Sequence, residues 1–471
     1  MRDLLQRYWF LICAVPYLGF WTYGLSDLDE GFYGAVTMDM LRRGDWITPT
    51  LNGTPWFEKP ILAYWLSMPL CAVLPNEFMA RLPSFLCTMA TAWVLYRFVK
   101  KHVSVDAAIL TALVYSTSIL VVGIGRMMMT DAPLVLCLTI AFTTFYESIL
   151  GDQKLRLATA AALGLAVLAK GPVALVLFGL IGIFSFWLLP DSRRNWGKHW
   201  VGGTVLVAGI VALWYVPCYL ANGQVFIQKF LIEQNIGRFR GGDKAHTLPV
   251  WANPVFFPAT LAVSFLPWIV GAFRSKFWKP QNPLDTYLLI WACAVTGFFT
   301  LSGSKLVHYV LPAIPPLAAL VAQSLLTRHP RPKPVSGWVA YAAVVSVLLC
   351  AVANYVFYTD WSRRFKDVQS FAVEAREKNL KLYQSRLGED TASPSGSPFK
   401  INDSGHPSLG FYYRGPVLEN DNNGESNAIF VGRRDAFLNA VAPVRSDQYS
   451  HIETRGNYSA RINEPRAPGQ K

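Results

Sequence analysis

The sequence has few charged residues and no cysteine pattern. Only 15% of its 471 residues are charged, while 52% are apolar. This balance excludes a disordered chain, which needs high charge and low hydrophobicity, and it differs from that of an ordinary soluble enzyme. The seven cysteines lie in apolar stretches without a CxxC pair. We therefore expect them to be small buried residues rather than disulfides or metal ligands.

Long apolar runs are abundant, and they predict an all-α polytopic membrane protein. A run of about 20 apolar residues is long enough for a helix to cross a bilayer. We count eleven candidate spans, with an error of about two because segment boundaries are poorly determined by sequence. The candidate spans are residues 8–25, 82–99, 107–124, 132–150, 157–169, 172–189, 201–221, 255–273, 286–301, 306–326 and 335–357.

Most of the net charge of +13 lies in the loops between these spans. If the N-terminus is cytoplasmic, the loops on that side hold 16 basic residues against six acidic ones. Because cytoplasmic loops of membrane proteins are enriched in Lys and Arg, this distribution predicts a multi-pass membrane protein with a cytoplasmic N-terminus. Topology thus accounts for the basic excess, and we expect no nucleic-acid partner.

The outer face is predicted to carry a structured first loop and a C-terminal domain. Within the outer loop 26–81, segment 60–75 is apolar but bounded by prolines, so we interpret it as an interfacial helix. Segment 31–43 has apolar residues at helical spacing and is likewise predicted to be an amphipathic helix. Residues 1–357 would form the transmembrane module. Residues 358–471 would form a small periplasmic α/β domain with a loose tail. Its predicted elements are a helix over 363–378 and strands at 380–384, 409–413, 428–431 and 451–454.

Several motifs resemble those of bacterial family 39 glycosyltransferases. The longest is LDEGFYGAVTMDMLRRGDWITPTLNGTPWFEKPILAYWL at 28–66. It is followed by MTDAP at 129–133, LAKGPVAL at 168–175, EQNIGRF at 233–239 and SGSKLVHYVLPAIPPLAAL at 302–320. This group contains the lipid A aminoarabinose transferase and, more distantly, the protein O-mannosyltransferases. The resemblance implies a GT-C fold with a cavity that opens outward, and sugar donors carried on polyprenyl or dolichyl monophosphate.

The chemistry of such a transfer explains which residues the resemblance selects. Negative charge builds on the departing phosphate, so cations lower the barrier, and a carboxylate can accept the proton of an acceptor hydroxyl. The candidates are Asp29, Glu30 and Asp131 for catalysis, Lys59, Lys170, Lys305 and Arg238 for the donor phosphate, and Tyr33, Glu58, Tyr309 and Glu233 for substrate binding.

Each candidate also has an ordinary structural interpretation. Asp29 and Asp131 could simply cap helices, and Lys170 and Lys305 could extend from span ends toward water. Arg238 could lie on a solvated loop face, and tyrosines commonly anchor the membrane interface. Glu58 could orient Lys59 or contribute to a site for a divalent metal, for which the sequence offers no recognisable ligand pattern.

One motif departs from the aminoarabinose transferases. There the DE pair is usually followed, two residues after the Glu, by an Arg, whereas this chain has Phe32. The later outer loop likewise has Glu233 followed by Gln234 in place of an EH pair. The resemblance therefore implies a general polyprenyl-phosphate-sugar transferase rather than one defined lipid A enzyme.

The predicted function is transfer of a sugar from undecaprenyl phosphate or a similar carrier to a periplasmic acceptor. That acceptor could be lipid A or lipopolysaccharide, another envelope glycan, or a protein. A lipid-linked sugar flippase would share the topology, but it should show inverted repeats or helices broken at the midplane, which the sequence does not show. A non-catalytic envelope assembly protein would share the topology without depending on Asp29.

Overall fold

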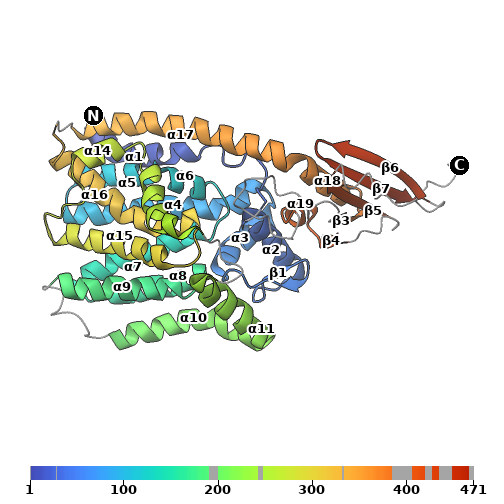
Figure 1. The fold of residues 1–471 in the computed structure, drawn as a ribbon, viewed down its shortest axis with the longest axis horizontal. Coiled ribbons are helices and arrows are strands. Elements are labelled where there is room, and N and C mark those ends of the chain that lie inside the picture. The colour runs from blue at the N-terminus through green and yellow to red at the C-terminus, as the bar shows by residue number, and fades with distance from the viewer. Residues whose placement is uncertain are drawn as a thin grey trace. The chain divides into compact units, whose positions relative to one another are not determined.

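The chain folds into two units in the computed structural model (Figure 1). Unit 1 comprises Met1–Phe20, Phe57–Leu66 and Arg81–Asn354, and unit 2 comprises Trp21–Trp56, Ser67–Ala80 and Tyr355–Lys471. The structure describes residues 2–27, 29–189, 200–241, 248–330, 334–384, 406–419, 427–433 and 448–465.

Unit 1 consists of helices. Three helices continue from one unit into the other, namely α3 (Leu62–Val73), α4 (Glu77–His102) and α17 (Val335–Arg364). The others are α1 (Arg2–Ala14), α5 (Val105–Ser116), α6 (Ile119–Gly125), α7 (Asp131–Ile149), α8 (Leu155–Lys170), α9 (Val173–Leu188), α10 (Trp200–Asn222), α11 (Gln224–Phe226), α12 (Arg238–Arg240), α13 (Asn253–Ser264), α14 (Ile269–Arg274), α15 (Pro283–Leu301) and α16 (Ile314–Thr327).

Six helices of the described residues are long and apolar enough to cross a membrane. The bent pair of α5 and α6, which meet at 65°, adds a seventh if it forms one span. These elements coincide with seven of the eleven predicted spans, and the predicted number of eleven is not confirmed. The six helices are Glu77–His102, Asp131–Ile149, Val201–Asn222, Pro283–Leu301, Val307–Thr327 and Val335–Arg364.

Prolines explain two of the remaining differences. The run 8–25 does not form one helix, because α1 ends at Ala14 and a 3-10 turn, η1 (Val15–Tyr17), contains Pro16. The run 255–273 is divided into α13 and α14, with Pro267 between them. Proline has no backbone N–H and its ring clashes with the preceding turn, so a helix ends or bends there.

Helices α7, α8, α9 and α15 pack together in the core of unit 1 (Figure 1). The rings of Phe142 and Trp291 meet edge to face with centroids 4.9 Å apart. The Tyr287 hydroxyl donates to the Phe142 carbonyl at 2.7 Å, which joins α15 to α7. This packing fixes the ends of α7 and α8, where the candidates Asp131 and Lys170 lie.

Two buried arginines hold the chain that follows α1. The Arg126 guanidinium donates through Nη1 to the carbonyls of Pro16 at 2.7 Å and Leu18 at 3.0 Å, and through Nη2 to Asn354 Oδ1 at 2.5 Å. Arg81 Nη1 donates to the Phe20 carbonyl at 2.7 Å. These cations, which the sequence predicts to lie at the outer face, therefore satisfy backbone acceptors where the helical ladder has ended.

We expect Arg126→Met to lower the free energy of unfolding by about 3 kcal/mol, because the Pro16 carbonyl, the Leu18 carbonyl and Asn354 Oδ1 lose a charged donor. The measurement is thermal or denaturant unfolding in detergent. The matched control is Arg97→Met, at an exposed position of α4 where the guanidinium lies over the Trp93 ring, and it should change stability by less than about 0.5 kcal/mol. Equal effects of the two substitutions would contradict this account of Arg126.

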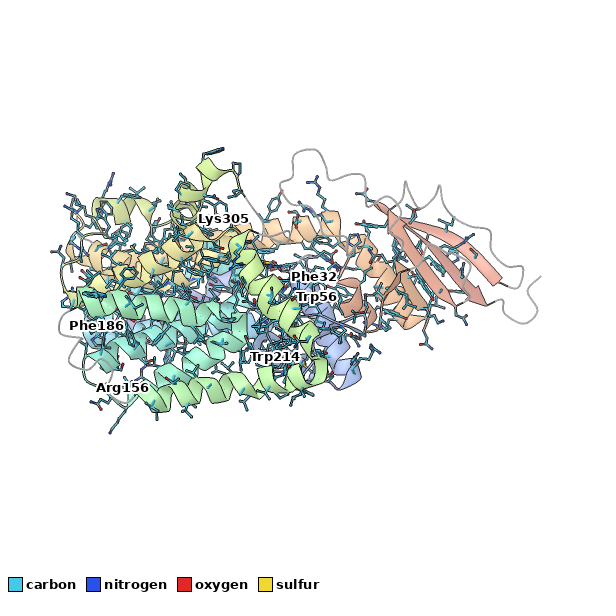
Figure 2. The ribbon with its side chains drawn as sticks, turned by 60° about the horizontal axis from the view of Figure 1, so that its bottom comes forward. Phe32, Trp56, Arg156, Phe186, Trp214 and Lys305 are labelled. Carbon is cyan, nitrogen blue, oxygen red and sulfur yellow. The ribbon has the colours of Figure 1, made fainter. Side chains whose placement is uncertain are left out.

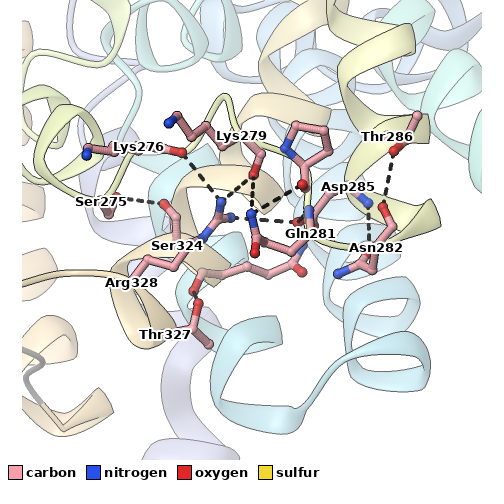
Figure 3. Close-up of polar contacts among 12 residues, drawn as sticks. Ser275, Lys276, Lys279, Gln281, Asn282, Asp285, Thr286, Ser324, Thr327 and Arg328 are labelled. Atoms are coloured by element: carbon pink, nitrogen blue, oxygen red, sulfur yellow. Dashed lines mark hydrogen bonds and ion pairs between the residues drawn. The ribbon is translucent and has the colours of Figure 1, made fainter.

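Arg328 ties several segments together at the end of unit 1 that is predicted to be cytoplasmic (Figure 3). Its Nη1 donates to the Lys279 carbonyl at 2.5 Å, and its Nη2 lies 3.7 Å from Asp285 Oδ2. Asp285 Oδ2 also accepts the Gln281 backbone N–H at 3.0 Å. The beginning of α15 is further stabilised by Asn282, whose side chain accepts the Asp285 N–H at 2.8 Å.

In unit 2, the first outer loop begins with helix α2 (Asp29–Arg43). Its first turn carries Asp29 and Glu30 and its last turn carries Arg42 and Arg43, which matches the helix dipole. A hairpin of β1 (Thr50–Leu51) and β2 (Thr54–Pro55) follows. Its turn is Asn52-Gly53, both with positive φ, the conformation that Asn-Gly favours in tight hairpins.

The C-terminal part of unit 2 contains a five-stranded sheet and a helix packed against it (Figure 1). Ile429 and Val431 alternate toward α18 (Lys366–Glu377) and contact its apolar side chains, including Phe371. The strands pair in the order β4-β3-β5-β7-β6, with β3 parallel to both of its neighbours and the other pairs antiparallel. They are β3 (Lys381–Gln384), β4 (Leu418–Glu419), β5 (Ala428–Arg433), β6 (Gln448–Arg455) and β7 (Tyr458–Pro465).

The predicted strand at 409–413 is wrong. This segment forms the short helix α19 (Leu409–Tyr413), which ends at Arg414 with a φ of 61°. Its aromatic residues favour a strand, but α19 packs against α2, and tertiary packing overrides that preference. β3, β5 and β6 lie where strands were predicted. The predicted tail beyond residue 465 lies outside the described residues.

Candidate active site

Helix α2 presents Asp29 in its first turn. The Tyr33 hydroxyl, one turn later, donates to Asp29 Oδ1 at 3.2 Å. Glu30 is fully buried, and its Oε2 accepts the Ser26 backbone N–H at 2.9 Å. Glu30 therefore fixes the chain at the beginning of α2, whereas the tyrosine orients the Asp29 carboxylate. The structure thus brings together two of the candidates, Asp29 and Tyr33.

Phe32 has a definite structural role. Its ring stacks on Trp56 with centroids 4.8 Å apart and planes 16° from parallel. Both side chains are labelled in Figure 2. The stack joins α2 to the chain that follows the hairpin. An aromatic contact thus occupies the position where the aminoarabinose transferases usually have Arg.

In unit 1, Asp131 and Lys170 form an ion pair. Asp131 begins α7 and Lys170 ends α8, and the Lys170 ammonium donates to Asp131 Oδ1. The same ammonium lies 5.2 Å from the centroid of the Tyr309 ring, a cation–π contact. Asp131 Oδ2 is buried without a hydrogen-bond partner. The three candidates therefore form one cluster, and it keeps a carboxylate oxygen available to a further donor.

Glu58 and Arg238 form a second charged pair in unit 1. Arg238 Nη2 lies 3.6 Å from Glu58 Oε2. Lys59, the next residue, is 9% exposed. The described residues contain no group of three or more His, Cys, Asp and Glu side chains that could hold a metal ion. Glu58 thus contacts a cationic side chain of its own chain.

Glu233 lies on a π-helix, η3 (Ile227–Gly237), which sequence reasoning missed. Eleven residues of π-helix are unusual, since this conformation is rare, mostly a single turn, and frequent at functional sites. Phe226 and Phe230 stack at 5.4 Å, and each meets the buried Trp214 of α10 edge to face. Trp214 is labelled in Figure 2. Phe57, beside Glu58, packs on Phe226 at 5.4 Å. This aromatic cluster fixes η3 to the segment carrying Glu58 and Lys59.

Two glycines allow loops of unit 1 to approach the π-helix and its end. Gly171, directly after Lys170, has a φ of 94°, and a Cβ there would lie 3.0 Å from Asn235 Oδ1. A Cβ on Gly303 would lie 2.5 Å from the backbone N of Gly241. The KGP and SGSK motifs therefore require glycine because the loops that carry the candidate lysines pack closely on the 227–241 segment.

Lys305 acts as a cap in this structure (Figure 2). Its ammonium donates to the carbonyls of Phe299 at 3.1 Å and Thr300 at 3.0 Å, and also to the Ser302 carbonyl. These carbonyls lie at the end of α15, where the backbone lacks helical partners and a cation is favourable. Burial lowers the pKa of this ammonium below its ordinary value.

An apolar groove also lies in unit 1. It has a volume of about 460 Å³ and is lined by α6, α13 and neighbouring residues, among them Leu120, Trp251, Val255, Phe256 and Ala259. Thr260 and Ser264 are its polar lining residues. A groove of this composition on a membrane protein suits a hydrocarbon chain.

Comparison with known proteins shows which proteins this chain resembles. The family profile described as dolichyl-phosphate-mannose-protein mannosyltransferase matches residues 58–217. An undecaprenyl phosphate-alpha-4-amino-4-deoxy-L-arabinose arabinosyl transferase of Shewanella sediminis is 34% identical over 321 residues, covering 64% of this chain and 57% of the relative. An uncharacterised protein of Aquifex aeolicus is 32% identical over 364 residues, covering 76% of this chain and 80% of that protein. The chain therefore resembles the glycosyltransferases named by this profile and by the Shewanella relative.

Solved structures show the fold of this chain. The crystal structure of ArnT from Cupriavidus metallidurans bound to undecaprenyl phosphate matches with a TM-score of 0.73 over 96% of each chain, at 20% identity. The oligosaccharyltransferase AglB of Archaeoglobus fulgidus matches with a TM-score of 0.53 over 91% of this chain and 69% of that one, at 12% identity. The chain is therefore a multi-pass membrane protein with a GT-C fold. It spans just over half the length of the Shewanella relative.

Proposed function

We propose that this chain transfers a sugar from a polyprenyl-phosphate donor, such as an undecaprenyl-phosphate sugar, to an acceptor at the outer face of the inner membrane. The Asp131–Lys170 pair carries the proposal, because it holds a cation and a carboxylate oxygen without a hydrogen-bond partner on two of the motifs that resemble the family's. The relatives named as arabinosyl transferases support the same donor class. The acceptor is lipid A or lipopolysaccharide, another envelope glycan, or a protein.

The transfer breaks the bond between the anomeric carbon and the phosphate oxygen. The acceptor oxygen forms the new bond to that carbon from the opposite side, which inverts its configuration, and the electron pair leaves with the polyprenyl phosphate. Asp29 accepts the proton of an acceptor hydroxyl, with Tyr33 orienting the carboxylate. If the acceptor is itself a phosphate, no base is needed, and Asp29 then positions the acceptor.

The candidate cations of unit 1 stabilise the departing phosphate. Lys170 is held in a fixed position by Asp131, and Arg238 by Glu58. Preorganised cations are effective because they need no rearrangement as charge develops. We assign Lys59 to the same role, and Glu233 and Tyr309 to substrate binding. Lys305 contributes to the phosphate site only if its ammonium leaves the carbonyls that it caps.

We further propose the topology that the loop charges predict. The N-terminus is cytoplasmic, residues 1–357 form the transmembrane module, and residues 358–471 form a periplasmic domain. The outer loop 26–81 and the motifs near Lys170 and Lys305 then face the periplasm, where a lipid-linked donor presents its phosphate.

The apolar groove is proposed to hold part of the polyprenyl chain. We expect Ala259→Trp to raise KM about tenfold for a long-chain donor, with little change in kcat, because the indole fills space used by the isoprene units. A donor with a short chain should be affected less. Ala351→Trp, at an exposed alanine of α17 outside the groove lining, is the matched control. Identical KM values for both variants and both donors would contradict this role.

The acceptor is identified by mass spectrometry of envelope lipids and glycoproteins from a deletion strain. One glycosylated species should disappear, return with the wild-type gene, and remain absent with the Asp29→Asn gene expressed at equal abundance. Restoration of that species by Asp29→Asn would contradict the assignment of Asp29. An unchanged envelope would contradict the proposed function.

A further inference from the structure

The segment His406–Tyr413 contacts the chain just before Asp29. Asp27 Oδ2 lies 2.6 Å from His406 Nδ1, and Asp27 Oδ1 accepts the Ser408 backbone N–H at 2.9 Å. The Tyr412 hydroxyl accepts the Leu25 backbone N–H at 2.8 Å. Asp27 is 7% exposed. Both oxygens of this carboxylate are thus engaged by a segment some 380 residues away in the sequence.

A second layer of hydrogen bonds supports this contact. Gln369 of α18 donates through Nε2 to the Leu25 carbonyl at 2.8 Å and to Ser408 Oγ at 2.9 Å. Its Oε1 accepts the indole N–H of Trp361 at 2.6 Å. On the other side, His406 Nε2 lies 2.8 Å from the hydroxyl of Tyr458, the first residue of β7. His406 is therefore held between the sheet and Asp27.

Glycines bring the same segment close to α2. A Cβ on Gly31 would lie 3.0 Å from the Ser408 backbone N and 3.1 Å from Asp27 Oδ1. A Cβ on Gly410 would lie 3.1 Å from the Ala35 Cβ. The close contact of this segment with α2 thus explains why the DEG motif has a glycine at position 31. The C-terminal segment contacts both the residues before α2 and the helix itself.

We propose that His406 is a positioning residue for Asp29. It acts through Asp27, fixing the chain direction two residues before Asp29 and so the orientation of the first turn of α2. This inference rests on the proposed function, in which Asp29 takes part in transfer. The soluble C-terminal segment thereby contributes to turnover without touching the donor, because small displacements of a reacting group cost large factors in rate.

The test compares His406→Ala, His406→Asn and the control His451→Ala in reconstituted transfer. His451 lies on β6, whose sheet neighbour is β7. We expect His406→Ala to lower kcat between about 10-fold and 100-fold with donor KM changed less than about 3-fold. Asn can place an amide N–H near the Nδ1 position and should restore most of kcat. His451→Ala should retain the wild-type kcat.

Two results would overturn the inference: an unchanged kcat in His406→Ala, or a loss that His406→Asn does not restore. If His406→Ala folds poorly, Tyr458→Phe removes only the hydroxyl that contacts His406, and it should lower kcat about 3-fold with unaltered thermal stability. An unchanged kcat in Tyr458→Phe would then count against the inference.

Hydrogen exchange separates this inference from the proposed function. Backbone amides of residues 29–33 should exchange about 10-fold faster in His406→Ala than in the wild type or in His406→Asn, because local opening becomes easier. Unchanged exchange would overturn the inference. If the wild type and His451→Ala both make no product, the proposed function fails, and the exchange result alone decides whether His406 positions this turn.

Discussion

Asp29→Asn is expected to lower kcat for sugar transfer to a hydroxyl acceptor by about 10³-fold, within the range attributed to a general base. The amide keeps the size of the side chain and can still accept the Tyr33 hydroxyl, which donates to Asp29 Oδ1 at 3.2 Å. It cannot take up a proton. The loss should therefore appear in kcat, with donor KM nearly unchanged.

The control for this substitution is Asp45→Asn in the same outer loop. Asp45 Oδ1 accepts the backbone N–H groups of Ile47 and Thr48 at 2.8 and 3.0 Å, which an asparagine oxygen can also do. Asp45→Asn should thus retain wild-type activity. The measurement is initial rate against donor concentration for folded, monodisperse protein. Full activity of Asp29→Asn would remove this residue from the mechanism.

Lys170→Met is expected to lower kcat/KM for the donor between about 10²-fold and 10³-fold, comparable to the loss of one preorganised donor at a developing anion. Methionine keeps much of the length of the side chain and removes the charge. Lys101→Met is the control, because Lys101 pairs with Glu147 at 2.5 Å and is predicted to face the cytoplasm. A similar loss in both variants would show a general effect of removing lysines.

A double-mutant cycle separates the roles of Lys170 and Asp131. If Asp131 acts by holding Lys170, Asp131→Asn should add little to the loss already caused by Lys170→Met, because residues that share an interaction are not additive. If Asp131 touches the substrate independently, the two losses should multiply. The same cycle should show coupling in stability, since removing one partner leaves the other charge buried.

The sequence predicted well the elements that depend on local patterns. An amphipathic helix was expected over 31–43. The observed helix α2 begins two residues earlier, at Asp29, so that the acidic residues Asp29 and Glu30 lie in its first turn. Helix α3 lies within the proline-bounded segment 60–75. The motifs also indicated the proteins that this chain resembles, because a long run of specific residues in one loop is informative even without an alignment.

The sequence predicted less well what depends on contacts distant along the chain. Nothing local indicates that Lys305 caps α15, or that Arg126 binds the Pro16 and Leu18 carbonyls. A cation predicted at the outer interface could bind either a phosphate or a backbone carbonyl, and only the fold distinguishes these two roles. The Leu409–Tyr413 helix was mistaken for a strand because its aromatic residues favour β-structure outside this packing.

Some signals in the sequence had no clear interpretation without the fold. The π-helix Ile227–Gly237 has no recognised pattern, although its close contact with Gly171 explains the glycine of the KGP motif. The pairing of Asp27 with His406 joins residues 379 positions apart. The sequence does not indicate this partner of Asp27, because hydrogen-bonding partners this distant leave no periodic pattern in one sequence.

Transfer by purified protein in liposomes tests the central claim most directly. The donor is a polyprenyl-phosphate sugar labelled in the sugar, and both the labelled acceptor and the released polyprenyl phosphate are quantified. We predict that the two products form in equal amounts with wild-type protein and that both form about 10³-fold more slowly with Asp29→Asn when the acceptor is a hydroxyl. Movement of intact donor across the bilayer, with no polyprenyl phosphate released, would contradict the account and indicate a flippase.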